Sequence, residues 1–108
     1  MTVKTQMTGS WSQSQTGGQL RTAVYDPNNQ ELFIGSLQGH PNAVVAAGGD
    51  PNAPGLCGLV LAEKAGTIYF EDISGTYPAK LKDIDRDAIK AALKQVFGVD
   101  VEYGLPRS

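Results

Sequence analysis

The chain has one cysteine, one histidine and one tryptophan in 108 residues, and it has no long hydrophobic run. A single cysteine forms no internal disulfide, so the sequence gives no sign of an oxidising compartment. The best apolar stretches stop at Asp50 and Glu63, far short of the roughly 20 residues that span a bilayer. The polar N-terminus also lacks the basic and apolar regions of a signal peptide. We therefore expect a soluble protein in the cytoplasm, or one delivered without a cleaved signal.

An excess of either charge is also missing. Nine basic and eleven acidic residues give a formal charge of -2, and the basic residues are scattered along the chain. The sequence therefore shows no strong signal for binding nucleic acid or a membrane surface. A chain of this length buries one small core. We predict residues 19–108 as a single domain and residues 1–18 as a polar, mobile lead-in, with Trp11 docked on the domain by its large apolar area.

Alternation of apolar and polar residues predicts five strands in this domain. Turn residues after Tyr25 and before Thr67 join the first four strands into two hairpins. The predicted strands cover residues 20–25, 31–34, 59–63, 67–71 and 99–103.

Two helices are predicted, and both have clear end signals. His40-Pro41-Asn42 opens a short, mostly buried helix that ends at Gly48-Gly49, because proline suits the first turn and glycine the position after the last. Apolar residues spaced three and four apart predict a longer helix over 84–97, with Gly98 as its stop. The order ββ-α-ββ-α-β indicates an α+β domain with a mainly antiparallel sheet and both helices on one face.

His40 and the string Ser74-Gly75-Thr76-Tyr77-Pro78 are the main candidates for chemistry. At the start of the short helix, a neutral imidazole can act as a base or a hydrogen-bond donor, since the helix dipole disfavours its charged form. The alternative is a capping or surface histidine. The string places two hydroxyls and a phenol around a glycine, which either points polar groups into a cleft or forms an ordinary turn.

Cys57 has two interpretations. It is a thiolate nucleophile paired with His40 or, as is commoner for a free cysteine, a buried residue entering a strand. One cysteine and one histidine do not supply the three or four ligands of a usual zinc site, and Val60 stands where a CxxC motif needs its second cysteine. No metal or cofactor is predicted.

Two further motifs have simple explanations. Residues 48–52, Gly-Gly-Asp-Pro-Asn, either cradle a phosphate through backbone amides or end the short helix. Glu71 and Asp72 are adjacent on a predicted strand, so they point to opposite faces and do not form an acid–base pair, although one of them can still lie near His40.

The succession of segments resembles C-terminal domains of bacterial polymorphic toxins and secreted effectors over about the last two thirds of the chain. The matching segments are His40 with 44–48, 58–60, 65–68, 74–78 and 97–99. In that pattern the string is Ser-Gly-His-Tyr-x-Pro, whereas this chain has Thr76 in place of the second histidine and its proline one position early, with Ala79 at the expected place. The resemblance implies a role in antagonism towards bacteria or a host, with His40, Ser74 and Tyr77 as site positions.

The leading hypothesis is a toxin-like or effector-like domain with a cleft formed by His40, Ser74, Thr76 and Tyr77, and a cognate inhibitor protein as its partner. It predicts that His40 and Tyr77 approach each other across a pocket. The alternative is a non-enzymatic protein-binding module or small homodimer that associates through a sheet edge. That alternative predicts an exposed apolar patch or paired strands instead.

Overall fold

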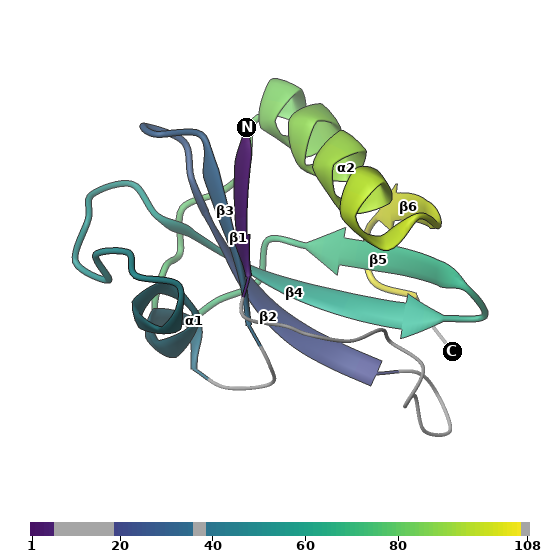
Figure 1. The fold of residues 1–108 in the computed structure, drawn as a ribbon, viewed down its shortest axis with the longest axis horizontal. Helices are drawn as coiled ribbons and strands as arrows, with labels where there is room; N and C mark the ends of the chain where they lie inside the picture. The colour runs from purple at the N-terminus through teal and green to yellow at the C-terminus, as the bar shows by residue number, and fades with distance from the viewer. Residues whose placement is uncertain (6–18, 36–38, 107–108) are drawn as a thin grey trace.

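The computed structural model describes residues 1–5, 19–35 and 39–106. Within these residues, six strands form one sheet with a helix on each side, which confirms the predicted α+β class (Figure 1). The elements are β1 (Thr2–Thr5), β2 (Gln19–Asp26), β3 (Glu31–Gly35), α1 (His40–Ala46), β4 (Cys57–Lys64), β5 (Thr67–Glu71), α2 (Asp83–Phe97) and β6 (Asp100–Tyr103).

The strand order of the sheet is β1-β3-β2-β4-β5-β6. The four central strands pair antiparallel. The β2–β3 and β4–β5 pairs are the expected hairpins, and the β2–β4 pairing joins the two hairpins into one sheet. Both outer pairings are parallel, because β1 runs beside β3 and β6 returns beside β5 after α2. The sheet is therefore mixed, and the prediction of a mainly antiparallel sheet is corrected at both edges.

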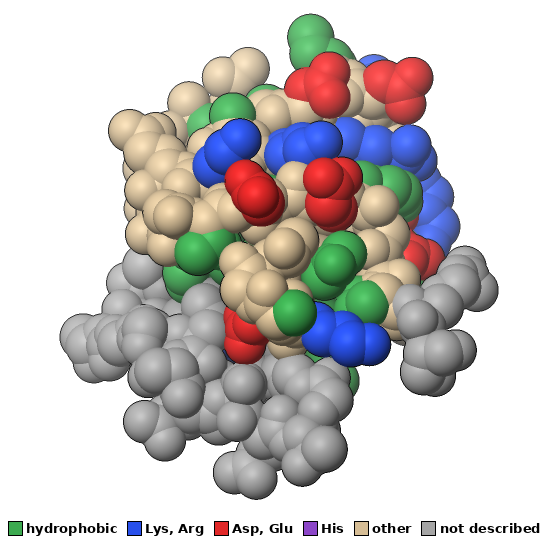
Figure 2. Space-filling view, turned by 90° about the vertical axis from the view of Figure 1, so that its right-hand side faces the viewer, with side chains coloured by type: hydrophobic (Ala, Val, Ile, Leu, Met, Phe, Trp, Pro, Cys, Tyr) green, Lys and Arg blue, Asp and Glu red, His purple; other side chains and the backbone are tan. Residues whose placement is uncertain are grey.

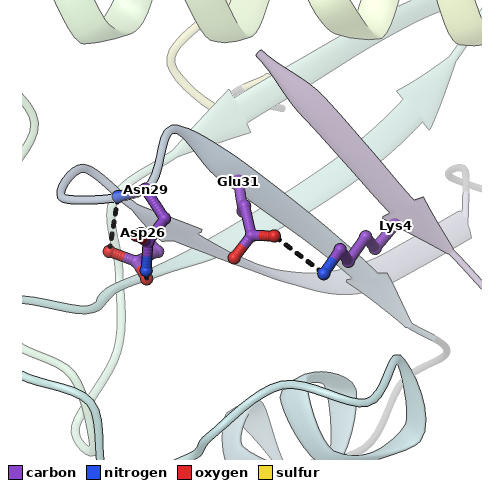
Figure 3. Close-up of polar contacts among 4 residues, drawn as sticks. All are labelled: Lys4, Asp26, Asn29 and Glu31. Carbon is purple, nitrogen blue, oxygen red and sulfur yellow. Dashed lines mark hydrogen bonds and ion pairs between the residues drawn. The ribbon is translucent and has the colours of Figure 1, made fainter.

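Strand β1 lies in the stretch predicted as a mobile lead-in. The Thr2 N–H donates to the Gln30 carbonyl at 3.0 Å. The Lys4 ammonium lies 2.7 Å from the Glu31 carboxylate, next to the β2–β3 turn (Figure 3). Four residues with one large apolar side chain give too weak a pattern to be recognised as a strand. The rest of the lead-in, including the predicted anchor Trp11, lies outside the described residues.

The β2–β3 turn is stabilised by Asp26, as its sequence indicates. The Asp26 carboxylate accepts a hydrogen bond from the main-chain N–H of Asn28 at 2.9 Å. It also accepts hydrogen bonds from the main-chain N–H of Asn29 at 3.4 Å and from the Asn29 side-chain amide at 2.9 Å (Figure 3). Aspartate at the start of a turn commonly bonds the backbone in this way. The carboxylate is buried, but these donors replace the water it loses.

The two helices pack on opposite faces of the sheet, which corrects the prediction that both cover one face (Figure 1). Neighbouring residues of β2 show the division. Tyr25 packs in the cluster beneath α2, whereas Val24 packs with Val44 of α1. The periodicity of a helix shows which of its sides is buried, but it contains no information about which face of a sheet receives that side.

The main core lies on the α2 face. Ile89 and Leu93 of α2 are fully buried against Phe70 and the other apolar side chains on that face of the central strands. Gly98 ends α2 with φ 69°, and its N–H donates to the Lys94 carbonyl at 2.8 Å.

The α1 face carries a smaller cluster, whose buried members are Val24, Phe33, Val44 and Leu56. Only Ala43 and Val44 of α1 are buried, and Val45 is 56% exposed. The prediction that α1 is mostly buried is therefore wrong, because the helix turns one side to the sheet and the other to solvent. Neither α1 nor α2, the helices of the described residues, is long and apolar enough to cross a membrane.

Candidate functional site

His40 and Ser74 meet on the α1 face, 34 positions apart in the sequence. His40 is the first residue of α1, and Ser74 opens the turn that follows β5. The Ser74 hydroxyl lies 3.2 Å from His40 Nδ1, and both side chains are half-buried. The structure thus brings together two of the residues predicted to form the site, His40 and Ser74.

The second ring nitrogen determines the protonation of this pair. His40 Nε2 lies 3.0 Å from the Leu59 carbonyl oxygen, which can only accept a hydrogen bond. Nε2 therefore carries the proton, and in the neutral imidazole Nδ1 is left with an electron pair. Ser74 donates its hydroxyl proton to that electron pair, so the contacts form a chain from hydroxyl to imidazole to carbonyl.

Gly58 in β4 makes this contact possible. A Cβ at position 58 would lie 2.3 Å from the Ser74 Cβ and 3.0 Å from the His40 Cδ2, so any side chain there would push the pair aside. The sequence analysis did not identify Gly58 or the Leu59 carbonyl as parts of the site. A glycine within a strand is nonetheless a signal for a close approach of another segment, and it was the sequence feature that could have identified this position.

Ser74 also organises the turn that follows it. Its oxygen accepts hydrogen bonds from the main-chain N–H groups of Thr76 and Tyr77 at 3.2 and 3.0 Å. The Tyr77 carbonyl in turn accepts the Gly58 N–H at 3.2 Å, which fixes the turn against β4. The candidate residue Thr76 is exposed, and it contacts the site through its main-chain N–H, which donates to Ser74 Oγ.

The Tyr77 hydroxyl is directed to the loop between α1 and β4. It donates to the Pro51 carbonyl at 2.6 Å, while the ring packs against the cluster beneath α1. Burial, with a smaller contribution from Asp50, raises the pKa of the Tyr77 phenol. The phenol therefore stays protonated at neutral pH and ties the loop to the turn.

Cys57 lies on the other side of the sheet. Its side chain belongs to the core beneath α2, whereas the next residue, Gly58, faces His40. Burial raises the pKa of the Cys57 thiol to about 11, so the thiolate needed for nucleophilic attack is scarce at neutral pH. The geometry accordingly favours the interpretation of Cys57 as a buried core residue over a Cys57–His40 pair.

Gly48 and Gly49 end α1 and do not leave their amides open for a phosphate. Gly48 has φ 82°, and its N–H donates to the Val45 carbonyl at 3.0 Å. The Gly49 N–H donates to the Val44 carbonyl at 2.8 Å. These two bonds form the usual glycine-containing end of a helix.

Glu71 and Asp72 are both used to hold the C-terminal part of the chain. Glu71 accepts the Leu105 N–H at 2.9 Å. Asp72 is buried and accepts hydrogen bonds from the Leu81 N–H at 3.0 Å and from the Tyr103 hydroxyl. Burial alone would raise the pKa of Asp72, but these hydrogen bonds and the nearby Lys80 ammonium outweigh it, and the pKa is lowered.

Opposite charges are intermixed on the face shown in Figure 2, where Lys and Arg side chains lie beside Asp and Glu. The Lys90 ammonium lies 3.9 Å from the Glu102 carboxylate, which joins α2 to β6. Within residues 1–5, 19–35 and 39–106, no group of three or more His, Cys, Asp or Glu side chains is placed to hold a metal ion.

Comparison of the chain with protein families, curated proteins and solved structures found no match.

Proposed function

We propose that the protein is a toxin-like or effector-like domain that acts through the Ser74–His40 pair. The observation that carries the proposal is the 3.2 Å contact between Ser74 Oγ and His40 Nδ1, in a tautomer that the Leu59 carbonyl fixes. A serine hydroxyl is a weak nucleophile until a neighbouring base accepts its proton, and an orienting third group keeps that base in position. Ser74, His40 and the Leu59 carbonyl supply these three roles.

The surrounding contacts support the same roles. Two main-chain N–H groups already point at Ser74 Oγ, and they stabilise negative charge that develops on it when the proton moves to His40. Tyr77 acts as a positioning residue, since its hydroxyl bonds Pro51 and its N–H bonds Ser74.

Growth of bacteria that express the chain tests this proposal. We expect the wild type to arrest growth, and both Ser74→Ala and His40→Asn to relieve the arrest. Asparagine is the informative replacement, because its side-chain oxygen still accepts the Ser74 hydroxyl proton in a hydrogen bond but does not act as a base at neutral pH. Circular dichroism and thermal unfolding check that both variants are folded.

A harmless wild type, or a folded Ser74→Ala variant as toxic as the wild type, would overturn the proposal. In the toxin-like interpretation a cognate inhibitor protein is the expected partner, and co-expression with candidate inhibitors should restore growth.

A second candidate function, a protein-binding module or small homodimer, is favoured by the two sheet edges. Within the part of the chain that the structure describes, strands β1 and β6 each have one neighbour in the sheet. Each therefore presents backbone groups to an added strand, which is a common mode of association. The mass of the native assembly in solution tests this candidate, since a monomer over the micromolar range excludes the homodimer.

A further inference from the structure

The surroundings of Ser74 also indicate a class of substrate. We infer that the Ser74–His40 pair acts on carboxylic acyl compounds, that is esters or amides, and that the main-chain N–H groups of Thr76 and Tyr77 stabilise the oxyanion formed in the reaction. This inference rests on the proposed function, because it requires Ser74 to be the nucleophile.

The positions of the two N–H groups carry the inference. They lie 3.2 and 3.0 Å from Ser74 Oγ, on adjacent residues of one turn. Attack on an acyl carbon converts Oγ into an ester-like oxygen, which accepts hydrogen bonds weakly, and places negative charge on the carbonyl oxygen of the same carbon. The two donors, which point at Oγ before the reaction, then have a stronger acceptor on the acyl carbon that Oγ has attacked. Fixed N–H donors directed at a developing oxyanion are the usual means of stabilising it.

The electrostatic surroundings favour an acyl carbon over a phosphoryl group. Among the described residues, His40 and Ser74 form hydrogen bonds with a carbonyl, two N–H groups and each other, and no Arg, Lys or carboxylate takes part in these bonds. Phosphoryl transfer is ordinarily assisted by Arg, Lys or a metal ion that neutralises the phosphate oxygens. Ser74 is half-buried and Thr76 is exposed, so the turn that carries the two N–H groups lies at the surface.

The reaction has two halves, acylation of Ser74 and hydrolysis of the acyl-enzyme. Ser74 Oγ forms a bond to the acyl carbon while its proton passes to His40 Nδ1, and the carbonyl electron pair moves onto oxygen. Collapse of the tetrahedral intermediate breaks the bond to the alcohol or amine, which leaves with the proton from His40. Water then attacks the Ser74 ester with His40 again accepting a proton, and the carboxylic acid and the free Ser74 hydroxyl are released.

Labelling of the intact chain with a fluorophosphonate tests the inference. Serine attack on this probe expels fluoride and leaves a stable adduct whose phosphoryl oxygen occupies the place of the oxyanion. We expect one adduct by intact mass, located on Ser74 by peptide mapping and absent in Ser74→Ala. The folded His40→Asn variant should label at least 100-fold more slowly, because it retains an acceptor but no base.

A matched pair of substitutions at one position separates the oxyanion role from a general effect on the turn. Thr76→Pro removes the main-chain N–H, whereas Thr76→Ala removes the side chain and keeps the N–H. The expected labelling rate of Thr76→Pro is about 100-fold to 1,000-fold below that of Thr76→Ala, the usual effect of deleting one oxyanion donor. Circular dichroism confirms that both variants are folded before their rates are compared.

Absence of an adduct on the folded wild type, an adduct that persists in Ser74→Ala, or equal rates for the two Thr76 variants would overturn the inference. These outcomes are distinct from failure of the proposed function. Growth arrest that depends on His40 and Ser74 without any adduct would retain the pair as the site and reject the acyl substrate.

Discussion

The segment after β5 carries two polar side chains, Asp72 and Ser74, on opposite faces of the sheet, and their hydrogen bonds differ in what they leave available for chemistry. On the α2 face, Asp72 is an acceptor whose donors are a main-chain N–H and the Tyr103 hydroxyl. On the α1 face, Ser74 donates to an imidazole nitrogen that can take its proton. The Asp72 contact fixes structure, whereas the Ser74 contact fixes structure and places a base beside a hydroxyl.

The two faces also differ in how much apolar packing they contain, and the α2 face has more. The core beneath α2 is extensive and includes residues from five strands and α2, whereas the cluster beneath α1 has four buried members. A small cluster at the edge of a domain leaves loops and turns that a ligand can approach. The face with less packing is therefore the one that carries the candidate site.

The largest effect on the free energy of unfolding is expected when one phenylalanine from each face is replaced by alanine and the two losses are compared. Phe70→Ala beneath α2 should lower the free energy of unfolding by about 3–5 kcal/mol, because the extensive core cannot collapse into the space. Phe33→Ala beneath α1 should cost less, since the neighbouring loop can close around the smaller side chain. Urea unfolding measures both, and an equal or larger loss for Phe33 would contradict the ranking of the two faces.

The next largest effect on stability is expected at Gly58 of β4, where Ser74 lies close to the strand backbone. Gly58→Ala should cost about 1–3 kcal/mol, because the new methyl group overlaps Ser74 and forces a shift. Gly75→Ala is the matched control: nothing lies within 4 Å of its added Cβ, so its stability should stay within about 0.5 kcal/mol of the wild type. Equal stability of the two variants in thermal unfolding would show that the turn does not hold Ser74 against β4.

Low pH should destabilise the fold on the α2 face, because it protonates Asp72. Its pKa is lower in the folded protein than the unfolded value of 3.8, so the ionised carboxylate stabilises the fold above that pH. This contribution declines as the pH falls through 3.8 towards the lower folded value. Asp72→Asn should lower stability at pH 7 by about 1–3 kcal/mol and flatten the loss of stability below pH 4.

The exposed Asp87→Asn variant is the control for this experiment. Its stability at pH 7 should remain within about 0.5 kcal/mol of the wild type. If the free energy of unfolding of Asp72→Asn declines below pH 4 as steeply as that of the wild type, the Asp72 hydrogen bonds do not govern acid unfolding.

The smallest effect is expected for Tyr77→Phe on the α1 face. The substitution removes the hydroxyl that bonds the Pro51 carbonyl and keeps the packed ring, so it should cost about 0.5–1.5 kcal/mol. If Tyr77 only positions the turn, the Tyr77→Phe variant should keep much more of the growth arrest and of the fluorophosphonate labelling rate than the His40→Asn variant does. A loss as large as that of His40→Asn in a folded variant would instead assign the hydroxyl a direct role.

Local sequence patterns predicted most elements of the fold. The periodicity of α2 with its glycine stop, the two hairpins with their turns, and the Pro–Gly signals of α1 depend on neighbouring residues, which a sequence displays directly. Strand β1 was missed because four residues of weak pattern become a strand only through pairing with β3. The placement of α1 and α2 on opposite faces was missed because it depends on how loops cross the sheet.

The candidate site was predictable in its residue types and not in its geometry. His40 and Ser74 drew attention as chemically able side chains beside turn-forming residues. The Leu59 carbonyl carries no side-chain signal, and the partner of the Tyr77 hydroxyl, Pro51, lies in a loop of irregular structure. Such contacts are made between distant backbone positions, which no local pattern specifies.

The overlap at Gly58 links two positions in the evolution of such sequences. A Cβ at position 58 and a side chain at position 74 compete for the same space, since the two Cβ atoms would lie 2.3 Å apart. Natural variants should therefore keep glycine at 58 wherever serine stands at 74. Lineages that acquire a larger residue at 58 should have glycine at 74. They would lack the Ser74 hydroxyl, and position 58 would no longer need to be glycine.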